Sequence, residues 1–343
     1  SEAVYAKAVA EHLGTDHTEV YLHAEQALAV IPLLPDLYDE PFADSSQIPT
    51  FLVAQTARQY VTAALSGDGG DELFGGYNRY IWIPKIWRNI SRLPYGLRRK
   101  FCRLFIHVSG MEFVNWQSRV PFLPDRLRVV QVGDKLRKLG ERLQNVRNLD
   151  DFYLSLLAEW RTPEDILLAG HEPSTLLNDR SAWPELRRPE ERMMYLDAMT
   201  YLPDDILCKV DRAAMGVSLE TRVPFLDHRV AELAWRIPFH MKIRNGRGKW
   251  ALRRILYKYV PQELIERPKQ GFSVPLGGWL LGPLREWAEN LLAPSRLSAE
   301  GYFRPEPIQR KWREHVRGER NWEHSLWSIL MFQAWLEAQS EGG

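Results

Sequence analysis

The sequence has little of what would place it in a metal-binding, disulfide-stabilised or membrane-spanning class. It contains two cysteines, Cys102 and Cys208, which lie far apart and have no metal or redox spacing. They favour a reduced, cytoplasmic location. The nine histidines show no ligand pattern either. No uncharged apolar run approaches the roughly 18 residues of a membrane span, and no signal peptide opens the chain.

The chain also lacks an excess of charge of either sign. Its 45 Lys and Arg residues balance 44 Asp and Glu residues, for a net charge of +1. That balance excludes nucleic acid and membranes from the expected partners. With 343 residues, of which 45% are hydrophobic and 26% charged, the chain is long enough for two domains or one large one.

The first eighty residues alternate between helical and strand patterns. We expect helices over 1–14, 24–34 and 48–60, and strands over 17–22 and 61–65. This alternation predicts a parallel α/β sheet that binds ligands beyond the carboxyl ends of its strands.

The remainder of the chain is dominated by helical patterns. We therefore expect an α/β layer over residues 1–80 and a mainly helical part of the same domain over 81–343. The chain opens on a helix with no strand before it, which predicts that a first strand and its phosphate loop precede Ser1.

A glycine-rich acidic stretch, "ALSGDGGDELFGGY" (64–77), follows the second predicted strand. It is not a Walker A loop, a dinucleotide-binding motif or an EF-hand, because the required spacings are absent. A turn of this kind at a strand end presents backbone N–H groups to a phosphate or nucleotide. Asp71 and Glu72 are the predicted Mg²⁺ ligands, because Mg²⁺ often binds one or two carboxylates plus substrate phosphates. The alternative is an ordinary glycine-rich turn with acidic residues in water.

A second motif, "YLPDDILCKVDRAAMGVSLETRVPFLDHRV" (201–230), begins with a predicted helix start at Pro203. Asp205, Lys209 and Arg212 follow at helical spacing and form one charged stripe. The stripe is either an exposed row of ion pairs or one wall of a cleft for a zwitterionic amino acid.

Further along the same motif, Glu220, Arg222 and Asp227 lie among apolar neighbours. We expect these three residues to form buried ion pairs that fix a turn.

A third motif places Lys249 in the predicted first turn of a helix over 249–259, after Gly246 and Gly248. A cation there opposes the helix dipole, at a cost of a few tenths to about 1 kcal/mol. The lysine is either simply exposed or faces an anion such as a polyphosphate.

Together these motifs resemble the synthetase domain of glutamine-hydrolysing asparagine synthetases. The matching stretches are "SGDGGDELFGGY", "LPDDILCKVDRAAMGVSLETRVPFLD", "GKWALR" and "RPKQGFSVP". The resemblance implies an ATP pyrophosphatase (adenine nucleotide alpha hydrolase-like) fold with ATP and Mg²⁺. It implies adenylation of the aspartate side-chain carboxylate, followed by attack of ammonia on the acyl-adenylate.

The resemblance also implies roles for individual residues. Ser66 and Gly67 would contact ATP, and we extend this nucleotide contact to Gly69 and Gly70. Asp68 stands where the family often has glutamate, at a position tied to forming the aspartyl-adenylate. Asp71 would bind Mg²⁺ with the pyrophosphate, and Lys249 would stabilise the departing phosphates.

The family begins with a cysteine-nucleophile glutaminase domain and an S-G-G-x-D-S pyrophosphate loop, which this sequence does not contain. The resemblance therefore predicts an N-terminal glutaminase domain as a partner, supplying ammonia from glutamine, and an inactive isolated segment. It leaves homodimerisation open. Three alternatives also stay open: β-lactam or lasso-peptide ring closure, amidation of another carboxylate, and a non-catalytic nucleotide-binding module.

Overall fold

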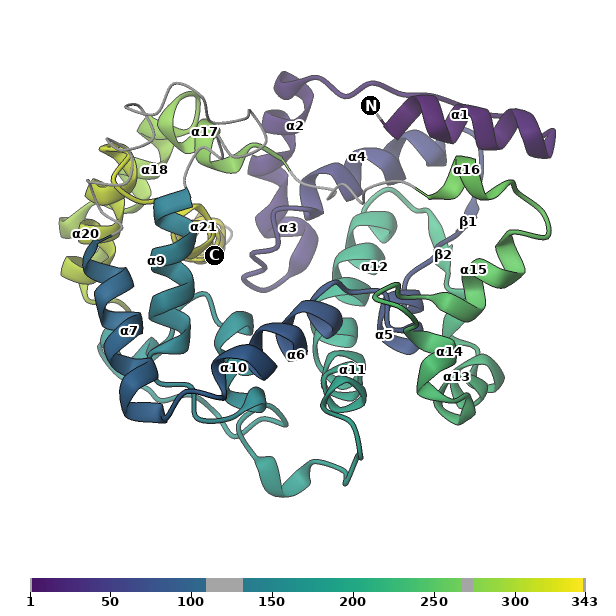
Figure 1. Ribbon diagram of the computed structural model, residues 1–343. Coiled ribbons are helices and arrows are strands. Elements are labelled where there is room, and N and C mark those ends of the chain that lie inside the picture. Colours follow the sequence, from purple (N-terminus) through teal and green to yellow (C-terminus); the bar gives the residue numbers. More distant parts are fainter. Residues whose placement is uncertain (1, 109–131, 267–273, 342–343) are drawn as a thin grey trace, which may run out of the picture. The chain divides into compact units, whose positions relative to one another are not determined.

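Helices make up most of the computed structural model, which describes residues 2–108, 132–266 and 274–341. The chain divides into two units: residues 1–81, 194–275 and 334–343 form unit 1, and residues 82–193 and 276–333 form unit 2. Three of the boundaries fall inside helices (Figure 1), namely α6 (Arg79–Ile90), α11 (Pro189–Met199) and α21 (Glu323–Glu341).

Unit 1 contains a two-stranded sheet and ten short helices within the described residues. The strands are β1 (Ala63–Leu65) and β2 (Glu220–Arg222). The helices are α1 (Glu2–Leu13), α2 (Ala24–Val30), α3 (Leu34–Tyr38), α4 (Gln47–Arg58), α5 (Gly70–Phe74), α12 (Cys208–Met215), α13 (His228–Arg236), α14 (Phe239–Lys242), α15 (Trp250–Leu256) and α16 (Gln262–Ile265).

The two strands pair in parallel, with Ala63 opposite Glu220 and Leu65 opposite Arg222. This confirms the expected α/β class with a parallel sheet, and it confirms the strand expected over 61–65. Helices also lie where the first eighty residues predict them. α4 packs along α12 (Figure 1), and Ala54, Ala214 and Leu219 form a buried apolar cluster between these elements and the sheet.

Two expectations about strands and ion pairs are wrong. The predicted strand over 17–22 is irregular chain with exposed side chains, because within the described residues no segment pairs with it. The ion pair of Glu220 and Arg222, which the sequence predicts to be buried, is exposed: 57% of the glutamate and 64% of the arginine side chain is in contact with water. Both residues lie on β2, where their side chains face outward. Asp227 caps α13 and pairs with Arg229 near the surface.

The helix expected to start at Pro203 is also different, because the chain is already helical there. α11 is followed closely by a π-helical segment, Leu202–Leu207, which leads directly into α12. A π-helical turn shifts the phase of the helix face, and such turns occur frequently at functional sites. Asp205 on this segment and Lys209 on α12 belong to one polar network, described below.

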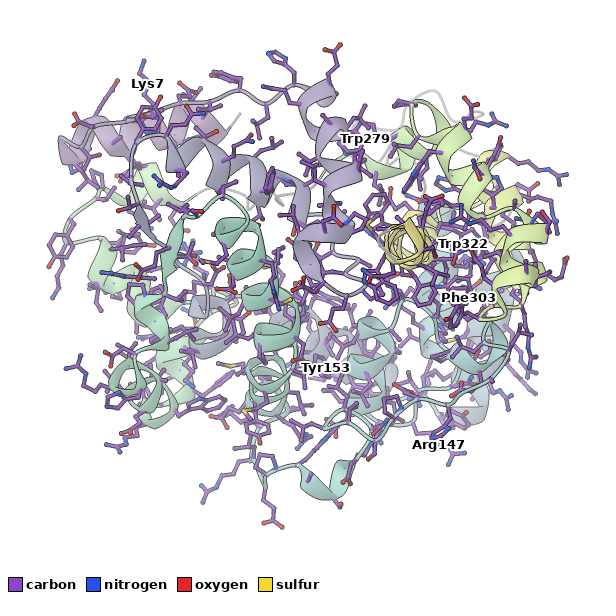
Figure 2. The ribbon with its side chains drawn as sticks, turned by 180° about the vertical axis from the view of Figure 1, so that it is seen from behind. Lys7, Arg147, Tyr153, Trp279, Phe303 and Trp322 are labelled. Atoms are coloured by element: carbon purple, nitrogen blue, oxygen red, sulfur yellow. The ribbon has the colours of Figure 1, made fainter. Side chains whose placement is uncertain are left out.

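The regular elements described in unit 2 are helices, apart from an isolated bridge between Leu167 and Phe303, and residues 158–188 are mostly irregular chain. Its core includes Phe152, Tyr153 and Trp327, which are at most 1% exposed. Figure 2 labels Tyr153 and a further buried side chain of this unit, Phe303. The helices are α7 (Tyr95–Val108), α9 (Val132–Leu143), α10 (Leu149–Leu157), α17 (Leu276–Leu281), α18 (Arg285–Leu291), α19 (Pro294–Glu300) and α20 (Pro305–Val316).

Candidate active site

The glycine-rich acidic turn begins directly after β1, as the sequence predicts. The Ser66 N–H donates to the carbonyl of Arg222 at 2.8 Å, so strand pairing continues one residue into the turn. The Ser66 hydroxyl donates to the carboxylate of Asp68, and α5 follows from Gly70. The turn therefore lies at the carboxyl end of a parallel strand, where ligands of α/β sheets bind.

Lys249 contacts this same turn through both its backbone and its side chain. Its N–H donates to the carbonyl of Phe74 at 3.0 Å, and its Nζ lies 3.1 Å from Oδ2 of Asp71. Lys249 does not lie in the first turn of α15 but immediately before it, with a left-handed φ of 55°. That conformation costs about 1 kcal/mol for a residue with a Cβ, so it needs the surrounding contacts to persist.

Two glycines make this close approach possible. A Cβ on Gly76 would lie 1.9 Å from Oδ1 of Asp71 and 2.3 Å from Cε of Lys249. A Cβ on Gly248 would lie 2.1 Å from the carbonyl oxygen of Gly75. All three distances are too short for a real Cβ atom, so both positions require glycine for the Asp71–Lys249 pair to form.

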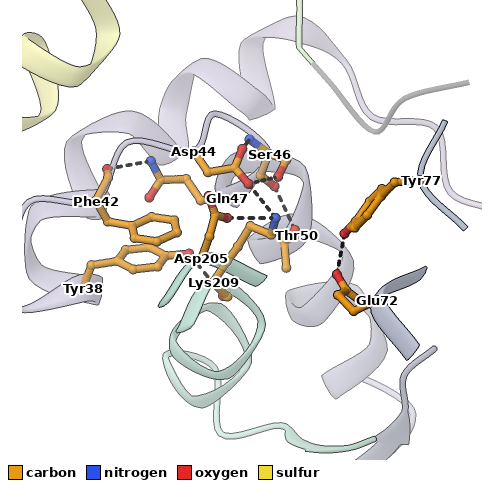
Figure 3. A network of polar contacts seen from close by, with 10 residues as sticks. All are labelled: Tyr38, Phe42, Asp44, Ser46, Gln47, Thr50, Glu72, Tyr77, Asp205 and Lys209. Atoms are coloured by element: carbon orange, nitrogen blue, oxygen red, sulfur yellow. Dashed lines mark hydrogen bonds and ion pairs between the residues drawn. The ribbon is translucent and has the colours of Figure 1, made fainter. Parts of the chain in front are cut away.

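Glu72 points into the protein rather than toward the ion pair. Its side chain is almost completely buried, and the Tyr77 hydroxyl donates to its Oε1 at 2.6 Å (Figure 3). Burial raises the pKa of Glu72, and the hydrogen bond from Tyr77 counteracts part of that rise. Burial and the Glu72 charge also raise the pKa of Tyr77, so the tyrosine stays a hydrogen-bond donor.

The two carboxylates named as Mg²⁺ ligands thus differ in how well they suit that cation. Asp71 has 23% of its side chain exposed and lies beside the turn, in keeping with a hard cation that shares a carboxylate and substrate phosphates. Glu72 suits the cation less well, because its side chain is almost completely buried and one of its oxygens already accepts the Tyr77 hydrogen bond. Across the described chain, no group of three or more His, Cys, Asp or Glu side chains suited to a metal ion is found.

A second polar network connects α12 with the segment before α4 (Figure 3). The Lys209 ammonium lies 2.6 Å from Oδ2 of Asp44 and 3.7 Å from Oδ1 of Asp205. Asp44 also accepts hydrogen bonds from the N–H and hydroxyl of Ser46, at 2.9 and 2.7 Å. The Tyr38 hydroxyl donates to the carbonyl of Lys209 at 3.2 Å, which fixes this turn of the helix.

The two carboxylates of this network titrate in opposite directions. Burial, and then the charge of Asp44, raise the pKa of Asp205 to about 7. Burial alone would raise the pKa of Asp44, but the Lys209 charge and the hydrogen bonds from Lys209 and Ser46 lower it. Near neutral pH, Asp44 is therefore the ionised partner of Lys209, and Asp205 is shifted toward its protonated form.

The structure brings Asp205 and Lys209 together but gives Arg212 a different partner. Nη1 of Arg212 lies 2.5 Å from Oδ2 of Asp39, a residue with a left-handed φ of 57° after α3. That pair is exposed, with 46% of the arginine and 69% of the aspartate side chain in contact with water. In this structure both cations of the predicted stripe have a carboxylate of the chain as partner.

Sequence reasoning missed Asp44, Tyr77 and Asp197. Asp197 is completely buried, and Arg79 binds it through Nε at 3.0 Å, while the Arg79 guanidinium lies 4.3 Å from the centre of the Tyr77 ring. Tyr77 ends the glycine-rich stretch, so its place in the sequence was a signal that could have identified it as a site residue. Asp44 and Asp197 carry no local signal, because their partners lie far away in sequence.

One motif falls outside the described chain. Residues 267–273 include Arg267, Lys269 and Gly271 of the "RPKQGFSVP" stretch and are not described.

Over the residues that are described, no helix has both the length and the apolar character needed to cross a membrane.

Comparison with known proteins decides the family. Residues 1–337 match the asparagine synthase family. The chain belongs to this family. The glycine-rich acidic turn, the π-helical segment with α12, and the Lys249 turn are thus parts of an asparagine synthase domain.

Over the aligned residues, curated members of the family are about one-third identical to this asparagine synthase domain. The glutamine-hydrolyzing asparagine synthetase 1 of Bacillus subtilis is 30% identical over 337 residues, covering 98% of this chain and 50% of the relative. A putative glutamine-hydrolyzing asparagine synthetase of Mycobacterium bovis is 35% identical over 347 residues, covering 98% of this chain and 48% of the relative. The chain spans about half the length of these relatives.

Proposed function

We propose that this domain catalyses ATP-dependent amidation of the aspartate side-chain carboxylate, giving asparagine, AMP and pyrophosphate. The observation that carries the proposal is the Lys249–Asp71 pair, 3.1 Å apart at the carboxyl end of β1. It combines a cation suited to phosphate charge with a carboxylate suited to Mg²⁺. The family membership supports the same reaction class, and the proposed fold type is the ATP pyrophosphatase one.

The turn after β1 is the proposed ATP site. Ser66, Gly67, Gly69 and Gly70 would contact the nucleotide through their backbone. The surroundings of Gly67 suit this role, because a Cβ on this residue would meet no described atom within 4 Å. Asp71 would hold Mg²⁺, which neutralises phosphate charge when it is bound, with Glu72 as a further proposed ligand.

Asp68 and Lys249 are the proposed catalytic residues. The carboxylate oxygen of the substrate attacks the α-phosphorus of ATP, and pyrophosphate leaves with the electrons of the broken P–O bond. Lys249 would stabilise the charge that grows on the oxygen between the α- and β-phosphates. Asp68, held by the Ser66 hydroxyl, would act at the adenylate. Ammonia then attacks the acyl carbon, and AMP leaves.

Asp205, Lys209 and Arg212 are the proposed contacts of the amino-acid substrate. Lys209 and Arg212 each already have an aspartate partner, at 2.6 and 2.5 Å. An aspartate substrate would therefore replace one carboxylate with another of the same chemistry. Ammonia would come from glutamine through a glutaminase domain N-terminal to this one, in keeping with the glutamine-hydrolyzing names of the relatives.

Transfer of oxygen isotope tests both the substrate and the route. In the full-length protein with ATP, Mg²⁺ and ammonium, aspartate labelled with ¹⁸O in its side-chain carboxylate should pass one ¹⁸O to AMP. The label is detected by mass spectrometry of AMP and by its ³¹P isotope shift. The atom moves because the carboxylate oxygen bonded to phosphorus stays with AMP when ammonia displaces it.

The same assay separates the alternatives. Label in inorganic phosphate, with ADP as the other product, would contradict adenylation. Labelled AMP from another carboxylate, but none from aspartate, would retain adenylation and reject the substrate. Absence of nucleotide turnover with every carboxylate supplied would indicate a non-catalytic module.

A further inference from the structure

Unit 2 contains a pocket of about 310 Å³ that no step of the proposed reaction uses. Side chains of α9, α20, the segment 158–166 and the start of α21 line it. Every lining residue belongs to unit 2. This volume is at the lower end of the roughly 300–1,000 Å³ range of ligand pockets, so it is large enough for a small metabolite.

Two tryptophans form firm walls of this pocket on either side of a lysine. Nζ of Lys311 lies 3.4 Å from the centre of the Trp160 ring and 4.3 Å from that of Trp322, which Figure 2 labels. The Trp160 indole donates to the carbonyl of Ser325 at 3.1 Å, and the Trp322 indole donates to Oε2 of Glu314 at 2.6 Å. These bonds fix the rings and leave the Lys311 amine at the pocket wall.

Lys311 lacks a counter-ion among the described residues, where no carboxylate oxygen lies within 4.0 Å of its Nζ. Burial, and then the charge of Arg320, lower the pKa of Lys311 to about 8; Arg310 acts in the same direction, and Glu159 and Glu314 act against it. The indole faces favour the charged form and oppose part of this shift. An anion in the pocket would stabilise the ammonium directly.

The pocket also has an acidic side chain without an ion pair to any described residue, Glu159. Its charge acts on Lys311, so the two groups face a common space. Arg320, by contrast, is already matched by Glu141, whose Oε2 lies 2.8 Å from Nη2. The pocket therefore offers groups of both signs that have no ion pair to a described residue, Lys311 and Arg310 among the cations and Glu159 among the acids, together with apolar indole faces.

We propose that this pocket binds a free α-amino acid, with its carboxylate at Lys311 and Arg310 and its ammonium at Glu159. A polyphosphate does not suit it, because Glu141, Glu159, Asp165 and Glu323 all line the walls. A simple cation does not suit it, because Lys311 and Arg310 would repel it. An aliphatic side chain on the amino acid would lie along the indoles. The site is separate from the proposed reaction and stands without it.

A matched set of three ligands tests the proposal. Protein labelled with 5-fluorotryptophan is titrated with L-norleucine, hexanoate or hexylamine and followed by ¹⁹F NMR, with Trp160 and Trp322 assigned through Trp→Phe variants. Norleucine should shift both resonances in a saturable way. Hexanoate, which lacks the ammonium, should bind about tenfold more weakly, and hexylamine should not bind.

Three variants assign the contacts. Lys311→Met should weaken norleucine binding by about tenfold or more, and Lys311→Arg should restore part of it. Glu159→Gln should make norleucine bind no better than hexanoate. Lys100→Met, at an exposed lysine of α7, should leave binding unchanged. Dispersed ¹⁹F resonances in each variant show that it folds.

Two ligand results would overturn the proposal: norleucine at millimolar concentration gives no saturable shift, or hexylamine binds as tightly as norleucine. Two variant results would also overturn it. In one, a folded Lys311→Met variant binds norleucine at full strength; in the other, Glu159→Gln still binds norleucine better than hexanoate.

Discussion

At the scale of single residues, the ammonium of Lys209 lies between two carboxylates that do not share its charge equally. Asp44 is 2.6 Å away and keeps a lowered pKa, whereas Asp205 is 3.7 Å away and has a pKa raised to about 7. Two ionised carboxylates facing one cation leave an excess negative charge in a half-buried site. A proton on Asp205 removes that excess.

This arrangement predicts a specific pH dependence of stability. The unfolded pKa of an aspartate is about 3.9, and the folded pKa of Asp205 is about 7. The stability that Asp205 contributes is therefore fully present below about pH 4 and is lost as the pH rises through about 7. Asp205→Asn keeps the neutral form at every pH, so its Tm relative to the wild type should increase from pH 5 to pH 8 by a few degrees.

Thermal unfolding of the two proteins, with Asp204→Asn as the control, gives the measurement. Asp204 is the exposed neighbour of Asp205 on the same helical turn. A Tm difference between Asp205→Asn and the wild type that stays constant from pH 5 to pH 8 would contradict the assigned pKa.

At the scale of elements, the turn between α14 and α15 is held directly against the turn that contains α5. The backbone bond from Lys249 to Phe74 joins them, and Arg253 of α15 donates from Nε to the carbonyl of Gly248 at 3.0 Å. Arg253 also binds Glu266 through Nη1 at 2.5 Å. The left-handed conformation of Lys249 is thus supported by its own bond to Phe74 and by the bond from Arg253 to the preceding residue, Gly248.

A single methyl group on Gly248 should separate these two turns. Its Cβ would lie 2.1 Å from the carbonyl oxygen of Gly75, a backbone atom that has little freedom to move. Gly248→Ala should lower the free energy of unfolding by about 1–3 kcal/mol, the usual cost of overpacking. Gly278→Ala, inside helix α17, is the control: nothing lies within 4 Å of its Cβ, so it should be neutral or stabilise the protein by up to about 1 kcal/mol. Urea unfolding of both variants checks this, and equal stability would mean that the two turns are not in contact.

Local pattern was sufficient for much of this architecture but not for its long-range contacts. α1, α4 and the strand after α4 have the periodicity and turn residues that define such elements by themselves. β2 has three residues, two of them charged, and becomes a strand only because β1 lies beside it. The segment 17–22 has strand-like residues but no described partner. Sheet pairing is a property of two segments, and one segment cannot reveal it.

The same distinction applies to the site. The glycines and acids around Asp71 are contiguous, so their spacing alone indicated a functional turn. The sequence singles out Lys249 because a cation near a helix start is unfavourable. It gives no sign of Asp44, whose role depends on Lys209, a residue distant in sequence. The left-handed backbone of Lys249 was not predictable either, because the bond to Phe74 that holds it is a tertiary contact.

At the scale of the whole molecule, features with their own chemistry are found in both units. Unit 1 carries the Asp71–Lys249 pair and the network around Lys209. Unit 2 carries the pocket around Lys311. The family membership covers nearly the whole chain, and the curated relatives are about twice as long. In the proposed reaction, Lys249 and the acidic turn of unit 1 promote formation of an acyl-adenylate from aspartate and ATP.

Exchange of labelled pyrophosphate into ATP tests that claim most directly. It is measured in the full-length protein with aspartate and Mg²⁺ present and ammonia withheld, so that only adenylation and its reversal occur. Lys249→Met keeps the apolar stem and removes the charge, and should slow exchange on the order of 10²-fold or more with the fold intact by circular dichroism. Lys249→Arg should recover only part of the rate, and Lys7→Met, at an exposed lysine of α1, should exchange like the wild type. Exchange by Lys249→Met at the wild-type rate would contradict the account.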